Sequence, residues 1–358
     1  MGFQNNAIFY EQNGVFVIKD FTKLRTEKQE EYCLKILLPI CRDSLIIHLM
    51  LEIIFLGTGA AAPINERNLS GTAVIRQGEI FLFDCGEGTQ MQFRRAGLRP
   101  GRLRYILITH LHGDHLFGLP GLLTSLHMAG CHQQIELFGP VGIAEYLRVH
   151  QQLCQFTLQY PLHIHEISAT TPAVLWQTEE FHLEWQPLSH GIFTAGFALV
   201  EASRPGRFDV ARADQLGIPN GPERGRLQRG ESVVLANGRC VHPEEVLGSP
   251  RPGLKLAYCL DTVPCVGAEK LAANAETLIA DSTFPQADAE HARKTGHSTA
   301  VEAAQLALKS GVQKLWLTHF SGRLSREDLP ALVAEARAIF PDSETATDLA
   351  RYIIKASE

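Results

Sequence analysis

Four side chains of types that commonly bind metals fall within six consecutive positions of this chain. They follow the apolar run 105–109 and are His110, His112, Asp114 and His115. In an extended chain the first three point to one side, and a turn at the glycine before Asp114 brings His115 beside them. Three imidazoles and one carboxylate suit zinc and similar transition metals, whereas magnesium and calcium prefer oxygen ligands.

A single histidine at the end of a strand is more often a solvated loop residue than a ligand. The clustering changes this interpretation, because burying such groups together without a cation leaves polar atoms unpaired, at about 1–3 kcal/mol for each. A bound metal removes that cost. The sequence therefore favours a metal site.

One ion takes three or four protein ligands, and the short spacing makes it hard for all of these residues to reach the same ion. Two metals about 3.5–4 Å apart, bridged by water or hydroxide, form the arrangement used in phosphoester hydrolysis. Such a pair needs further ligands at strand ends, where α/β sheets place their chemistry. Three residues that end or follow apolar runs meet this need: His190, Asp261 and His319.

The HxHxDH motif at 110–115 resembles the signature of the metallo-β-lactamase superfamily, and the longer string 109–123 (THLHGDHLFGLPGLL) resembles its ribonuclease Z branch. That branch trims the 3′ trailer from precursor tRNA. The resemblance covers roughly Met50 to the C-terminus. Its further matches occur in order at 55–59, 67–68, 83–90, 189–191, 260–262, 296–299 and 318–323.

This resemblance implies two zinc ions per subunit, with manganese as the alternative. One would be held by His110, His112 and His190, and the other by Asp114, His115 and His319. Asp261 would bridge them. Asp114 would also orient the attacking water as the base, because metal binding lowers the pKa of water toward about 7.

The resemblance also implies that His297 is the proton donor to the leaving 3′ oxygen, since an imidazole titrates near neutrality. A structural alternative exists, because the residues after His297 can cap the helix expected at 299–309. Three positions depart from the family pattern: Asn65 stands for a lysine, Leu260 for a glycine and Asp281 for a glutamate. Asp281 is one methylene shorter, so its hydrogen bond to His297 would need a small backbone shift.

Residues 203–230 are rich in glycine and proline, and their apolar residues look too sparse for a separate core. From Arg204 to Arg229 the segment holds six arginines against three acids. A charged loop is usually only solvated, but a positive excess in a chain of net charge −6 stands out. The segment resembles the arm by which ribonuclease Z grips tRNA. We expect it to protrude and contact phosphates through Arg204, Arg207, Arg224 and Arg226. Arg67, outside the arm in the loop at 65–68, is expected to contact the end of the tRNA.

A second basic cluster, between Arg94 and Arg104, follows a helix expected to begin near Thr89. Cations in the last turn of a helix are favoured by its dipole, which explains part of this cluster. Five arginines within eleven residues exceed that need, so an RNA path along them is an additional hypothesis.

Composition bears on membrane insertion, cellular compartment and DNA binding. The chain has 358 residues, of which 45% are hydrophobic, and no apolar run is long enough for a membrane span. Its eight cysteines form no CxxC pair, which indicates a reducing compartment, here the cytoplasm. The acidic total argues against non-specific DNA binding.

Short strand-like runs alternate with helical patterns, which predicts an α/β protein. Strands are expected at 51–56, 73–76, 80–83 and 105–109, and helices at 116–128, 141–150, 299–309 and 326–340. The resemblance implies the four-layer αββα sandwich of the metallo-β-lactamase fold, with the arm inserted. We therefore expect a nuclease domain at 50–358, preceded by an appended, weakly ordered segment at 1–49.

Three functional hypotheses follow. The first is a zinc-dependent tRNA 3′ endonuclease, a homodimer in which the arm of one subunit presents tRNA to the metal site of the other. The second is another hydrolase of this fold, acting on small phosphodiesters, thioesters or lactams. The third is an RNA-binding protein whose metals are structural, since a structural zinc site is closed whereas a catalytic one keeps a water position.

Overall fold

The computed structural model describes residues 10–12, 15–17 and 50–355. The chain divides between Leu49 and Met50 into two units. In the first, β1 (Tyr10–Gln12) pairs antiparallel with β2 (Val15–Val17). The expectation of a weakly ordered segment at 1–49 falls mainly outside the described residues.

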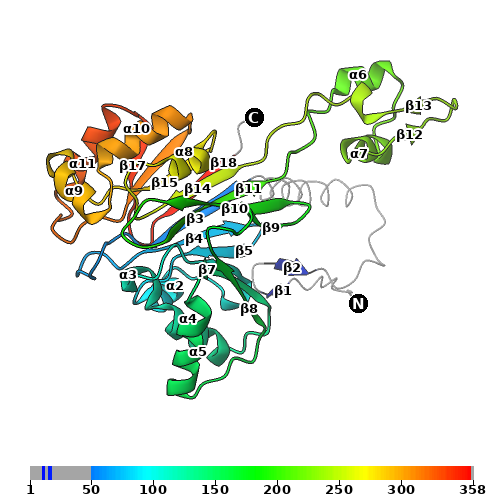
Figure 1. Cartoon of the computed structure of the whole chain (residues 1–358). Helices are drawn as coiled ribbons and strands as arrows, with labels where there is room; N and C mark the ends of the chain where they lie inside the picture. The colour runs from blue at the N-terminus through cyan, green and yellow to red at the C-terminus, as the bar shows by residue number, and fades with distance from the viewer. Residues whose placement is uncertain (1–9, 13–14, 18–49, 356–358) are drawn as a thin grey trace, which may run out of the picture. The chain divides into compact units, whose positions relative to one another are not determined.

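The second unit is built on two sheets of seven strands each (Figure 1). The first sheet has, in spatial order, β18 (Arg351–Lys355), β3 (Met50–Gly57), β4 (Gly71–Arg76), β5 (Glu79–Phe83), β6 (Leu103–Leu107), β7 (Ile135–Pro140) and β8 (Leu162–Ile167). The second has β17 (Ser343–Thr345), β16 (Lys314–Thr318), β15 (Thr277–Asp281), β14 (Lys255–Cys259), β11 (Thr194–Glu201), β10 (Phe181–Leu188) and β9 (Val174–Gln177).

Alternating side chains give each sheet two apolar faces. In β3, Ile53 and Phe55 belong to the core shared by the two sheets, whereas Ile54 and Leu56 belong to the core under the helices of the first sheet. These helices are α2 (Thr89–Arg95), α3 (Gly113–Leu116), α4 (Leu119–Met128) and α5 (Ile143–Cys154). A layer of α8 (Val266–Ala272), α9 (Ala289–Thr295), α10 (Ala300–Ser310) and α11 (Leu329–Arg337) accompanies the second sheet. The predicted four-layer αββα sandwich is confirmed.

The directions of the strands place the candidate ligand residues at the same end of the two sheets. The neighbours β5, β6 and β7 pair in parallel, as do β14, β15 and β16. β10 runs in the same direction as β14, because both pair antiparallel with β11. The residues that follow these strands therefore lie at the carboxyl ends of their sheets, where α/β proteins place ligand sites.

The inserted arm differs from its prediction in two respects. Bridges between Arg204 and Arg251 and between Phe208 and Leu247 extend it well beyond residue 230. It also has a core of its own, contrary to the expectation, and Figure 1 shows its elements apart from both sheets. These elements are α6 (Val210–Gln215), α7 (Pro222–Gln228), β12 (Val233–Val234) and β13 (Cys240–Val241).

The arm core was missed because its apolar residues are spread thinly along the chain. Leu227 from α7, Val233 from β12 and Val241 from β13 meet although polar stretches separate them in the sequence. Four of the seven buried residues of this core also lie beyond the predicted segment. None of the helices in the described ranges combines the length and apolar character that crossing a bilayer requires.

We expect Leu227→Ala to open the arm locally. The side chain is fully buried, and such truncations cost about 2–5 kcal/mol, a large share of what so small a core supplies. Trypsin should cleave the variant faster between residues 204 and 251 while the sheets keep their thermal midpoint. Val234→Ala, at a position that is 68% exposed, is the matched control. Equal cleavage rates for the two variants would contradict a cooperative arm core.

Candidate metal centre

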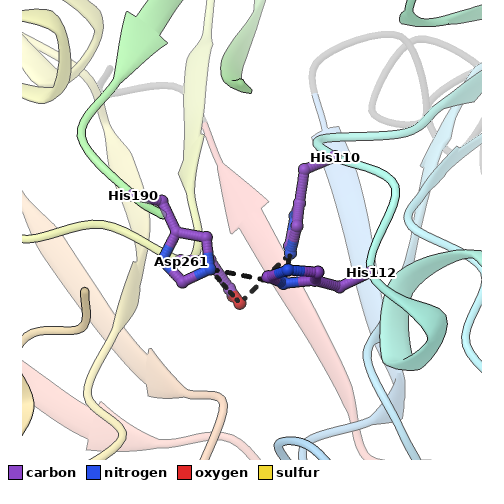
Figure 2. A group of neighbouring side chains, drawn as sticks. All are labelled: His110, His112, His190 and Asp261. Atoms are coloured by element: carbon purple, nitrogen blue, oxygen red, sulfur yellow. Dashed lines mark hydrogen bonds and ion pairs between the residues drawn. The ribbon is translucent and has the colours of Figure 1, made fainter. Parts of the chain in front are cut away.

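Side chains from both sheets converge at the carboxyl ends of the strands. His110 and His112 follow β6, Asp114 and His115 lie in α3, His190 follows β10, Asp261 follows β14 and His319 follows β16. They form two groups, in each of which the potential ligand atoms lie within 4.8 Å of one another. The first group is His110, His112, His190 and Asp261, shown in Figure 2. The second is Asp114, His115, Asp261 and His319, so Asp261 belongs to both.

Short distances among three imidazoles and one carboxylate define the first group. His112 Nδ1 lies 3.0 Å from His110 Nε2 and 3.4 Å from His190 Nε2. Asp261 Oδ2 lies 3.4 Å from His110 Nε2 and 3.9 Å from His190 Nε2.

The second group is equally tight. His115 Nε2 and His319 Nε2 are 3.2 Å apart, and each is 3.2 Å from Asp261 Oδ1. Asp114 Oδ2 lies 3.6 Å from both nitrogens. The same oxygen accepts a hydrogen bond from the backbone N–H of Ala61 at 2.7 Å. The carboxylate of Asp114 is thereby held toward the group.

Two histidines are oriented by direct acceptors. His115 Nδ1 lies 2.8 Å from the carboxylate of Asp84, and His190 Nδ1 lies 2.8 Å from the carbonyl of Gly296. Since these oxygens only accept, both rings carry a proton on Nδ1 and turn Nε2 toward the centre. Gly296 permits the approach, because an added Cβ would lie 2.7 Å from His190 Nδ1.

Two further histidines are oriented through threonine hydroxyls. Thr109 Oγ1 donates to Asp84 at 2.9 Å and is therefore free to accept from His110 Nδ1, also at 2.9 Å. In the second sheet, Thr283 Oγ1 donates to Asp281 at 2.7 Å and accepts from His319 Nδ1 at 2.9 Å. Each buried carboxylate thus fixes ring orientation on its own side of the centre.

This arrangement requires a positive charge between the inward nitrogens. With Nδ1 protonated, His115 and His319 face each other with lone pairs unless a proton or a cation lies between them. Burial alone would lower the pKa of His115, but the carboxylates of Asp261 and Asp84 raise it well above its usual value. The raised pKa favours a proton at this position, which a bound metal would displace.

Asp261 supports a metal more directly. It is 2% exposed, and its Oδ1 atom accepts no hydrogen bond from the described residues. Burial alone would raise its pKa, but the imidazoles of His115, His319 and His110 hold it well below the usual value. A buried, ionised oxygen that lies 3.2 Å from two imidazole nitrogens, all facing one point, suits a metal ligand. The nitrogen-rich donor set fits zinc or a neighbouring transition metal.

Backbone strain marks the same positions. Asp84, Asp261 and His319 have φ values of 58°, 54° and 64°, in the left-handed region that non-glycine residues rarely adopt. Such conformations cost about 1–3 kcal/mol each and cluster at functional sites. They let each side chain turn from its strand end into the space between the sheets.

The sequence analysis assigned no role to Asp84, Thr109 or Thr283. The signal was present, since Asp84 is a polar residue directly after a buried strand, as Asp261 is. Its partners His110 and His115 lie well apart from it in the sequence. Only the parallel pairing of β5 with β6 brings the carboxylate beneath them.

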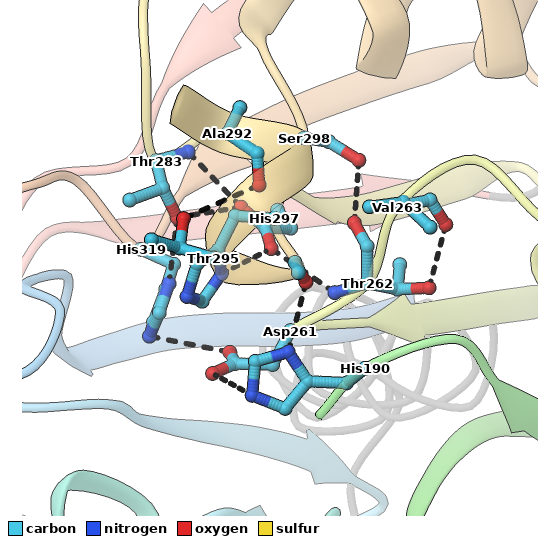
Figure 3. Close-up of polar contacts among 12 residues, drawn as sticks. His190, Asp261, Thr262, Val263, Thr283, Ala292, Thr295, His297, Ser298 and His319 are labelled. Carbon is cyan, nitrogen blue, oxygen red and sulfur yellow. Dashed lines mark hydrogen bonds and ion pairs between the residues drawn. The ribbon is translucent and has the colours of Figure 1, made fainter. Parts of the chain in front are cut away.

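His297 lies at the rim of the centre, with its ring centroid 5.0 Å from that of His190 and 5.2 Å from that of His319 (Figure 3). Its Nδ1 is 2.9 Å from Asp281 Oδ2, so the aspartate reaches it despite its shorter side chain. Burial would lower the pKa of His297, but Asp281 raises it to about 9. The expected cap of α10 by the residues after His297 is confirmed, because the Thr299 side chain accepts from Glu302 N–H.

The centre opens into a cavity of about 660 Å³, within the usual range for ligand sites. Asp114, His297 and Asp261 line it, together with the loop at 60–63 and Phe117. A substrate in this cavity therefore meets both groups of ligand residues and His297.

The structure does not support the expectation that Arg67 contacts RNA. The residue is 6% exposed, and its guanidinium donates to the carbonyls of Ser321 and Leu324. It joins two loops that line the cavity. Arg323, in one of these loops, is exposed.

The predicted arm arginines have different surroundings. Arg224 binds the carbonyl of Ile218 at 2.7 Å and pairs with Asp214, which holds it within the arm. Arg226 pairs with Glu231 at 3.0 Å but is exposed. Arg204 donates to the carbonyl of Pro252 at 3.2 Å, and Arg207 is exposed.

Comparison with known proteins relates this geometry to a family. Ribonuclease Z from a Cyanothece strain is 43% identical over 307 residues, which cover 84% of this chain and 95% of that protein. Ribonuclease Z from Microcystis aeruginosa is 44% identical over 307 residues, with 84% and 96% covered. The chain belongs to the ribonuclease Z family. Ribonuclease BN from Cronobacter sakazakii is also 43% identical, over 83% of this chain and 98% of that protein.

Solved structures agree with the ribonuclease Z assignment. The short form of human tRNase Z has a TM-score of 0.62 at 29% identity, covering 86% of this chain and all of that chain. The metallo-β-lactamase fold protein YhfI from Bacillus subtilis has a TM-score of 0.59 at 15% identity, which shows the fold alone. The family described as anti-Pycsar protein Apyc1 matches residues 51–190, less than half of the chain.

The hydrogen bond between the Thr283 hydroxyl and His319 Nδ1 predicts that Thr283→Val weakens metal binding. Valine keeps the shape but removes the acceptor for His319 Nδ1, so the ring loses its fixed orientation. We expect metal affinity to fall roughly 10–100-fold, as for other partners of metal ligands, measured by competition with a chromophoric chelator. Thr124→Val is the control, since that hydroxyl donates to Pro120 within α4. Wild-type affinity in Thr283→Val would show that the hydroxyl does not orient the ligand.

Proposed function

We propose that this ribonuclease Z family member is an endoribonuclease that removes the 3′ trailer from precursor tRNA. The observation that carries the proposal is the double group of ligand residues sharing Asp261, in a chain this similar to ribonuclease Z. A further support is the tRNase Z neighbour, which matches over its whole length.

The metals we propose are two zinc ions per subunit, with manganese as the alternative. One ion would be held by His110, His112 and His190. The other would be held by Asp114, His115 and His319. Asp261 would contact both ions. When bound, such a pair supplies Lewis acidity and a water that loses its proton near neutral pH.

The chain's own residues then carry the protons. The pKa of Asp114 would be raised by burial, but the neighbouring His319 and His115 lower it, so its carboxylate is ionised and accepts the proton of the attacking water. The water oxygen bonds to phosphorus as the bond to the 3′ oxygen breaks. His297 gives a proton to that oxygen, while Asp281 stabilises the imidazolium beforehand. The trailer keeps the 5′ phosphate.

Substrate binding would involve the arm. Arg207 and Arg226, which are exposed, are the first proposed phosphate contacts. Arg204 is partly exposed and remains proposed, whereas Arg67 is buried and Arg224 is held by Ile218 and Asp214. A folded arm offers these cations on a defined surface, which suits a structured RNA. We further propose a cytoplasmic homodimer in which the arm of one subunit holds the tRNA processed by the other.

A direct test is to incubate the protein with a 3′-extended tRNA, with and without a chelator. We expect one cut at the trailer junction, loss of cleavage with the chelator and recovery on adding Zn²⁺. A variant lacking residues 204–251 should lose tRNA cleavage but still hydrolyse a small phosphodiester. Cleavage of only the small ester by the intact protein would instead support the small-molecule hydrolase.

The His297–Asp281 pair predicts the alkaline limb of the pH profile. A proton donor works only while protonated, and Asp281 raises the pKa of His297, so activity is kept up to that pKa and lost above it. Asp281→Asn removes the charge and should move the alkaline limb of kcat to lower pH by roughly 1–3 units. Thr295→Val, in the same cavity, should leave the limb in place. An unmoved limb in Asp281→Asn at full metal content would exclude His297 as the donor.

A further inference from the structure

One wall of the cavity carries a large apolar ring with no role in the chemistry above. Phe117 is 63% exposed and lines the cavity beside Asp114 and His112. Isolated apolar residues are common on protein surfaces and need no explanation. This ring differs because it stands at a metal centre, where a substrate must pass.

The ring is held in place by the turn that carries the ligands. It packs over Gly113, where an added Cβ would lie 2.3 Å from a ring carbon. The backbone N–H of Phe117 also donates to Gly113 O at 2.9 Å. The ring is therefore positioned before substrate arrives, yet most of it stays accessible. Pre-positioned groups lose little entropy on binding.

The surrounding wall is apolar as well. Ala60, Ala61, Pro63 and Leu69 line the same cavity. An exposed aromatic face with apolar neighbours suits the flat face of a nucleobase, and stacking tolerates any base. Such a platform would serve an enzyme whose substrates differ in sequence at the cut.

We propose that Phe117 stacks on the base of the first trailer nucleotide, an inference that rests on the proposed function. The proposed chemistry determines on which side of the scissile phosphodiester the ring lies. His297 faces the leaving 3′ oxygen and hence the last nucleotide kept by the tRNA, between α9 and α10 of the second sheet's layer. Phe117 and Asp114 belong to the turn and helix that follow β6 of the first sheet. The nucleoside that retains the phosphate through its 5′ oxygen lies on that side.

The test is a double-mutant cycle between the protein and the RNA. Wild type and Phe117→Ala are compared on precursor tRNA that is intact, abasic at the first trailer position, or abasic at the last retained position. On intact RNA we expect Phe117→Ala to lower kcat/KM roughly 5- to 150-fold, which converts from ~1–3 kcal/mol per stacked base at 1.36 kcal/mol per tenfold. On RNA abasic at the first trailer position the two proteins should be alike.

Companion variants separate stacking from other roles. Phe117→Trp should retain activity, and Phe117→Leu, which still covers Gly113 but lacks a flat face, should not. Met128→Ala is the control for losing an exposed apolar side chain outside the cavity lining. Metal content and oligomeric state are measured for each protein.

Several results would overturn the proposal. Full activity in Phe117→Leu would exclude stacking as the role of the ring. Loss of the Phe117→Ala effect on RNA abasic at the last retained position, and not at the first trailer position, would place the ring on the other side of the cut. A change of oligomeric state in Phe117→Ala would make the ring a contact between copies of the chain. Failure of wild type to cut precursor tRNA would instead refute the proposed function itself.

Discussion

The negative charge buried at Asp261 is the constraint on which the site depends. One of its carboxylate oxygens lies close to His110 and the other to His115 and His319, and the residue is almost fully excluded from water. A carboxylate in such a place is stable only beside positive charge. The facing imidazoles can supply this charge only by taking up protons on their inward nitrogens, and a bound metal would replace those protons. A cation in each group of ligand residues would satisfy the carboxylate and the imidazole nitrogens at once.

The sandwich is organised to hold these groups from two sides. Asp84, after β5, orients His110 and His115, and Asp281, at the end of β15, orients His319 and His297. The hydroxyl of Tyr258, in β14, donates to Asp84 at 3.1 Å and links the two sheets at the centre. A shift of one sheet against the other would separate the ligands, so the apolar core between the sheets also fixes the metal geometry.

Much of this could be anticipated from the sequence. Local patterns identified the strands around 53 and 105, and the ligand candidates were visible because each polar side chain interrupts an apolar run. Residues acting across long sequence separations were harder. Asp84 orients histidines that follow another strand. The roles of the Thr109 and Thr283 hydroxyls can be recognised only from their hydrogen bonds in the structure. The arm core escaped detection because short apolar pieces far apart in the sequence assemble it. The burial of Arg67 was equally invisible, because its partners Ser321 and Leu324 lie more than 250 residues further along the chain.

Anomalous diffraction from crystals of the zinc-loaded protein tests the central claim most directly. The account predicts two peaks per chain, about 3.5–4 Å apart, with Asp261 between them and three further ligands on each side. One peak, or two peaks that do not share Asp261, would contradict it.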